Sequence, residues 1–161
     1  MPRNPRVALC FFGKHGDDAG PSRAMLPNAT ASTPIFRASF ASWRDRVVLA
    51  NPQLHFDVFA HSWSPEVASL FAELWTPRPS GAGGNRARPL LTRHAHEPTM
   101  YKREGQNGLA FRCEVSHGNC ERSASALLSL SRVLRLKQDY ELLEGKRYAA
   151  AIVARHDLLF A

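Results

Sequence analysis

The run from Arg6 to Phe12, RVALCFF, constrains the fold more than any other part of this sequence. After Arg6 it is continuously apolar and shows no alternation of polar and apolar residues, which is typical of a strand covered on both faces. Gly13 follows at once, and Lys14, His15 and Gly16 continue into a segment rich in Gly, Pro, Ser and Asn. The run therefore predicts a central strand of a parallel sheet that ends in a glycine-containing loop.

The rest of the chain alternates between strand-like and helix-like segments. Residues 54–61 (LHFDVFAH) and 148–160 predict two further strands. Apolar residues at helical spacing predict helices from Thr33 to about Asn51, from Ser64 to Pro77 and from Ser123 to Glu144. The order of strand, helix, strand, helix, long loop, helix and strand predicts one three-layer, Rossmann-like α/β domain with a mainly parallel sheet.

The length of 161 residues suits a single domain, which spans residues 1–161 in this interpretation. The longest apolar run is far shorter than the roughly 18 to 20 residues that cross a bilayer. The apolar stretch near the N-terminus has six residues, which are too few for a secretory signal. We therefore expect a soluble, cytoplasmic protein.

Residues 77–109 have no convincing periodicity and are biased toward Pro, Gly and Arg. Between Thr76 and Arg112 the chain carries seven basic and two acidic residues. A long basic loop of this kind predicts either a mobile functional segment or partial disorder. Its charge attracts phosphate-bearing ligands, or it serves solubility alone.

Ligands of parallel α/β sheets bind beyond the carboxyl ends of the strands. Three places in this chain fit that rule. They are residues 13–16 after the first strand, residues 61–63 after the second, and residues 155–157 near the end of the third.

Four segments in the same order resemble one family. They are the opening RVALCFFGKHG, the block FDVFAHSW, the segment from Ser123 through Leu143 to Gly145-Lys146-Arg147-Tyr148, and the terminal ARHDLLF. Together they are similar to the N-terminal portion of nucleotide-sugar-dependent glycosyltransferases with a GT-A-like α/β domain. The resemblance implies a transferase that binds a nucleotide-diphosphate sugar and an acceptor.

The resemblance also implies a donor site at the strand ends. Asp157 would contact Mn²⁺ or Mg²⁺, since such cations prefer oxygen ligands and commonly use carboxylates with substrate phosphates. Arg155 stands where the family has a first metal-binding aspartate, and an arginine suits a phosphate rather than a metal. The candidate substrate-binding residues are Gly13, Lys14, His15, His61, Trp63, Arg155 and Asp157.

The family's acceptor half should follow the last predicted strand, so we expect this chain to be a fragment. The acceptor-binding residues and the catalytic base would then lie beyond residue 161.

Several alternatives remain open from the residues alone. Asp157 could pair with Arg155 in a structural role, and His61 and Trp63 could belong to the core and its rim. Cys113, His117 and Cys120 could hold zinc with a fourth ligand, or remain thiols, or form a disulfide. The alternative function is a non-catalytic module whose arginine-rich loop contacts nucleic acid or an acidic partner.

Overall fold

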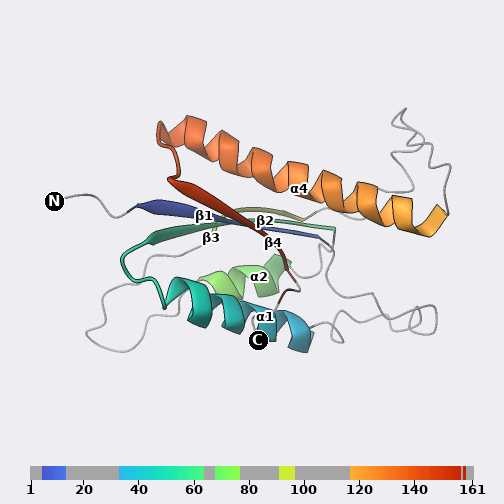
Figure 1. The fold of residues 1–161 in the computed structure, drawn as a ribbon, viewed down its shortest axis with the longest axis horizontal. Coiled ribbons are helices and arrows are strands. Elements are labelled where there is room, and N and C mark those ends of the chain that lie inside the picture. Colours follow the sequence, from blue (N-terminus) through green and yellow to red (C-terminus); the bar gives the residue numbers. More distant parts are fainter. Residues whose placement is uncertain are drawn as a thin grey trace.

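The protein forms a four-stranded sheet with helices on both faces (Figure 1). The structure, a computed structural model, describes residues 5–13, 33–63, 68–76, 91–96, 117–156 and 158. The elements in chain order are β1 (Arg6–Gly13), α1 (Thr33–Trp43), the π-helical turn η3 (Arg44–Val48), β2 (His55–Ser62), α2 (Ala68–Trp75), β3 (Leu91–His96), α4 (His117–Glu144) and β4 (Ala150–Arg155).

The strands lie in the order β3-β2-β1-β4, and every neighbouring pair is parallel. On β1, Val7 pairs with Phe56 of β2 on one side and with Ala150 of β4 on the other. The α/β class with a parallel sheet is thus confirmed. The strand order is compatible with the first half of a doubly wound sheet.

Successive residues of β1 enter two different cores. Val7, Leu9 and Phe11 pack with residues of α1 and α2 on one face of the sheet. Ala8 and Cys10 pack with Val133 and its neighbours on α4 on the opposite face. Because helices cover both faces, neither set of side chains can be polar, and this explains the unbroken apolar run.

The element boundaries differ in detail from the predicted ones. The helix expected from Thr33 to Asn51 is α-helical to Trp43 and continues as η3, while the helix expected from Ser123 begins at His117. The last strand is shorter than expected, since β4 ends at Arg155.

The expected absence of regular structure in residues 77–109 was wrong for six of them, because β3 lies inside that segment. Its sequence, LTRHAH, has too few apolar residues to show a strand period. Hydrogen bonding to β2 creates the strand. The remainder of residues 77–109 is outside the described residues.

A bulge in β3 places Arg93 against α4. Val58 pairs with Leu91, and the next residue of β2, Phe59, pairs with Arg93, so Thr92 is the additional residue. Leu91 packs on the α1 and α2 side, whereas the guanidinium of Arg93 lies 5.5 Å from the ring centre of Tyr140 on α4. The bulge therefore reverses which face the following side chains occupy.

A buried carboxylate connects the amino ends of the strands. The side chain of Asp57 is fully buried, and its Oδ2 lies 2.7 Å from Nη2 of Arg6. Tyr148 donates its hydroxyl to the same oxygen at 3.1 Å, and Thr92 donates to Oδ1 at 3.2 Å. Burial, and next the charge of Asp57, raise the pKa of Tyr148 well above its usual range. These four groups form a structural cluster at the edge away from the candidate site.

The middle of β4 is less covered than the other strands. Ile152 and Val153 are 37% and 42% exposed, while the core residues of β1 and β2 are almost fully buried. Among the described strands, β4 pairs with β1 alone.

Cys10 provides a test of this packing. Its thiol is buried between β1 and α4, and burial raises its pKa to about 11 from the ordinary 9.0. At pH 8, a cysteine with the ordinary pKa is roughly 10% thiolate, whereas Cys10 in the folded chain should be only about 0.1% thiolate. In a Cys113→Ser/Cys120→Ser variant, we expect Ellman's reagent to react at least about 100-fold more slowly with the folded chain than with the urea-unfolded chain.

The same shift affects stability at alkaline pH. The raised pKa keeps the Cys10 thiol neutral in the folded state. The contribution of this group to the free energy of unfolding is therefore complete below pH 9 and is lost as pH rises through 11. Urea titrations should show a loss of about 2 kcal/mol from this group between pH 8 and pH 11. A Cys10→Ala variant should have a shallower pH dependence, and an equal slope would contradict the assignment.

Candidate functional site

The carboxyl ends of β2, β1 and β4 lie side by side. Phe12 of β1 pairs with both His61 of β2 and Arg155 of β4, and Gly13 pairs with Ser62. Gly13, His61 and Arg155 therefore meet at one edge of the sheet, as the parallel arrangement predicted. Lys14, His15 and Asp157 are outside the described residues, so their assignment stays a prediction.

Gly13 has a backbone conformation that favours glycine, with φ at 123°. Its N–H donates to the Ser129 hydroxyl at 2.9 Å, and its carbonyl accepts from the Trp63 N–H at 3.3 Å. A Cβ at this position would lie 3.9 Å from Cδ2 of His156, which is an ordinary contact. The torsion angle, rather than lack of space, explains the glycine.

His61 and Trp63 lie beneath α4, with 0% and 5% exposure. The Nδ1 atom of His61 is 2.8 Å from the Ser129 hydroxyl oxygen, and Trp63 donates its indole N–H to the Ser125 carbonyl at 3.0 Å. The two rings meet edge to face at 4.7 Å. Both side chains are thus packed between the end of β2 and α4, and neither faces solvent.

His156 was not among the predicted site residues, although Arg155 and Asp157 flank it in the sequence. It is 3% exposed, and its Nε2 donates to the His61 carbonyl at 2.8 Å, so this nitrogen carries a proton. Its ring contacts those of Phe11, Phe36 and Phe71. The alternation of β4 could have indicated its inward position, because Ala154 lies in the same core.

Ser129 was also missed by sequence reasoning. It is fully buried on α4 and contacts both Gly13 and His61. Its spacing could have indicated that it is buried, since Ser129 lies four residues before Val133 on the apolar face of a long helix. A polar residue on such a face needs a hydrogen-bond partner elsewhere in the fold.

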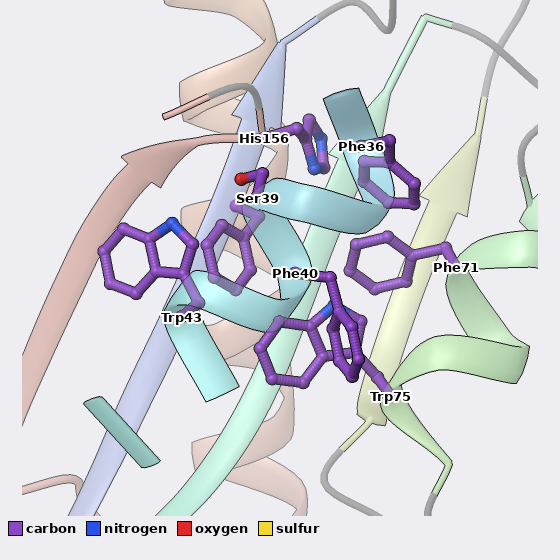
Figure 2. Close-up of a pocket in the computed structure, with 8 residues that line it drawn as sticks. Phe36, Ser39, Phe40, Trp43, Phe71, Trp75 and His156 are labelled. Atoms are coloured by element: carbon purple, nitrogen blue, oxygen red, sulfur yellow. The ribbon is translucent and has the colours of Figure 1, made fainter. Parts of the chain in front are cut away.

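Figure 2 shows the aromatic cavity beside this edge, with His156 and Ser39 among side chains of α1 and α2. Its volume is about 10 Å³, which is near the lower limit for one water molecule. Ligand pockets are usually roughly 300 Å³ or larger. We therefore interpret this cavity as a packing gap. Its lining residues are Phe11, Phe36, Ser39, Phe40, Trp43, Phe71, Trp75 and His156.

Leu158, which follows β4, is hydrogen-bonded to α1 next to this cavity. The carbonyl of Leu158 accepts from the Ser39 hydroxyl at 2.7 Å and from the Trp43 indole at 3.2 Å. Two side chains of α1 thus orient the segment that follows the candidate site.

The Ser129–His61 pair has the separation of a nucleophile and its base. Both side chains are fully buried, however, and the serine oxygen already accepts the Gly13 N–H. Among the described residues, the Ser129 side chain has no exposed surface. The pair is therefore a structural connection between α4 and the sheet.

Arg155 is exposed at the end of β4. Ala154 and His156 occupy the α1 and α2 side, so Arg155 lies on the opposite face. It is a cationic residue at the carboxyl end of β4, next to the end of β1. Its planar guanidinium suits a phosphate or carboxylate.

The described residues contain no group of three His, Cys, Asp or Glu side chains placed to hold a metal ion. Asp157 and Cys113, and the side chains of His117 and Cys120, are outside the described part of the chain. Their assignment to a metal or a disulfide stays a prediction.

Helices α1 and α2 begin near this same edge, since Phe36 and Phe71, each in the first turn of its helix, contact the ring of His156. Helix α4 begins at His117, about three turns before Ser129, and so extends beyond the edge. Ser129, in the first half of α4, contacts Gly13 at the end of β1, whereas Tyr140 lies over Arg6 at the start of β1. Thus α4 runs opposite to the strands, and Figure 1 shows α1 in the same sense on the other face. Helix amino ends carry partial positive charge and favour anions.

None of the helices in the described residues is long and apolar enough to cross a membrane. Comparison of the chain with protein-family models, with curated proteins and with solved structures finds no match. The geometry of the strand ends is therefore the basis for assigning a function.

Proposed function

We propose that this chain binds a nucleotide-diphosphate sugar at the carboxyl ends of β1 and β4. One observation carries the proposal. From β1 the chain adds β2 and then β3 at one edge of the sheet, and α1 and α2 cover one face. Helix α4 then crosses the opposite face, and β4 pairs on the other edge of β1. Open α/β sheets bind ligands where the strand order changes direction in this way.

The charges at this edge of the sheet favour an anion. Arg155 is an exposed cationic residue at the end of β4, and α1 and α2 begin near the same edge. A diphosphate can accept two parallel hydrogen bonds from one guanidinium. The sugar and the transfer reaction come from the resemblance of the four sequence segments to glycosyltransferases. A contribution from Mn²⁺ or Mg²⁺ at Asp157, an acceptor and a cytoplasmic location are parts of the same proposal.

Hydrogen bonds at the strand ends support this interpretation. Both backbone polar groups of Gly13 are hydrogen-bonded within the protein, and the His61 carbonyl accepts from His156. A ligand would therefore meet a preorganised floor, with phosphate contacts supplied by Arg155 and the adjoining segments.

Calorimetric titration with uridine and guanosine diphosphates, with and without Mn²⁺, tests the proposal. We expect saturable binding by the wild-type chain and roughly 10- to 100-fold weaker binding by Arg155→Ala, because a charge-assisted hydrogen bond would be lost. Arg135→Ala, which removes an exposed arginine from α4, is the matched control and should bind normally.

Two results would count against this function. One is the absence of nucleotide binding by a folded wild-type chain. The other is salt-sensitive binding to RNA that is unaffected by Arg155→Ala, which would favour the basic module described above.

A further inference from the structure

We infer that Ser129 is a positioning residue that sets the carboxyl ends of β1 and β2 for nucleotide binding. The inference rests on the proposed function and assigns a role to a side chain that does not touch the ligand. Its basis is the convergence of two strands on one buried hydroxyl.

Three backbone or ring atoms surround the Ser129 oxygen. The Gly13 N–H donates to it at 2.9 Å, while Nδ1 and the carbonyl oxygen of His61 lie at 2.8 Å and 3.3 Å. A serine hydroxyl has one hydrogen and two lone pairs. It can accept from Gly13 and donate to Nδ1, or accept from both Gly13 and Nδ1 and donate to the carbonyl. Either arrangement satisfies the hydroxyl.

The helix holds this hydroxyl at a fixed place. Val133, one turn further along α4, is fully buried against the sheet, and Ser125, one turn before, accepts the Trp63 indole N–H. The Ser129 side chain therefore cannot follow a displacement of Gly13 without moving α4. Helix α4 therefore holds the ends of both β1 and β2 through hydrogen bonds.

The position of Gly13 makes this contact relevant to a ligand. Gly13 is the last residue of β1, has a positive φ, and lies at the edge of the sheet where the nucleotide is proposed to bind. The Ser129 bond fixes the peptide plane at which the chain leaves the sheet. Without it, the N–H of the half-buried Gly13 lacks this acceptor, and the strand end can change direction.

The experiment compares Ser129→Ala with Ser131→Ala, which truncates an exposed serine two residues further along the helix. Amide hydrogen exchange followed by NMR should become at least about 10-fold faster at Gly13 in Ser129→Ala, while Leu9 and Val58 in the strand interiors keep their rates. The Kd for uridine or guanosine diphosphate should rise by about 10-fold under conditions in which both variants are fully folded. Ser131→Ala should match the wild type in both measurements.

A uniform rise in exchange across all strands would overturn the inference, since it would show only global destabilisation. Unchanged nucleotide affinity in Ser129→Ala would also overturn it. If the wild-type chain binds no nucleotide, the proposed function fails, and exchange at Gly13 alone decides whether Ser129 positions the strand end. Ser129→Cys, with a similar volume and a weak acceptor, should give intermediate exchange, and a rate equal to that of the wild type would contradict a role for the hydroxyl.

Discussion

Replacing Asp57 with alanine is expected to lower the free energy of unfolding by about 3 to 5 kcal/mol, as removal of one partner from a buried ion pair generally does. The change leaves the Arg6 guanidinium without the carboxylate at 2.7 Å and removes the acceptor of the Tyr148 and Thr92 hydroxyls. Because these groups come from β1, β3 and the segment before β4, the loss affects every pairing in the sheet. Urea titration at pH 7 provides the measurement.

An exposed ion pair supplies the control. Asp45 contacts Arg44 at 2.7 Å on the surface of η3, where solvent screens the charges. Asp45→Ala should leave the urea midpoint unchanged within error. Asp57→Asn keeps the shape but not the charge and should fall between wild type and Asp57→Ala. Equal stability of Asp57→Ala and wild type would contradict the proposed cluster.

Replacing Phe71 with alanine should cost about 3 to 5 kcal/mol, the range for a fully buried phenylalanine. Phe71 is 1% exposed on α2, and its ring contacts Phe36 of α1, Trp75, and His156 beyond β4. Its removal would enlarge the cavity of about 10 Å³ already present beside it. Denaturant titration would report the lost stability, and the NMR signals of His156 would report the loss of its ring neighbour.

Leu142→Ala is the matched control, since this leucine is 81% exposed on α4. It should change stability by less than about 0.5 kcal/mol. A similar small effect for Phe71→Ala would mean that α2 does not pack on the sheet as described.

The fold class could be predicted because local patterns match the two environments that the sheet creates. The apolar run in β1 indicated cover on both faces, and the periodicity around Val133 indicated a long helix against the sheet. β3 could not be predicted in this way. Its six mostly polar residues form a strand through hydrogen bonds to β2 and through a bulge at Thr92, and neither leaves a periodic pattern.

The candidate site was predicted only in part for a related reason. Residues at strand ends can be recognised by position, so the sequence alone predicts that Gly13, His61 and Arg155 lie at the ends of their strands. The side chains that meet them could not be recognised in this way, because Ser129 is 116 residues from Gly13 and 68 from His61. Hydrogen bonds over such separations depend on how α4 crosses the sheet.

The sequence by itself determined the alternation of strands and helices, the central place of β1 and the polar residues at the strand ends. These follow from local hydrophobic periodicity and glycine placement, which act over a few residues. The tertiary structure alone decided that His61 and Trp63 are covered while Arg155 is exposed, and that Asp57 joins the amino ends. The reason is that burial and hydrogen bonding between distant segments depend on which surfaces meet when the helices cover the sheet.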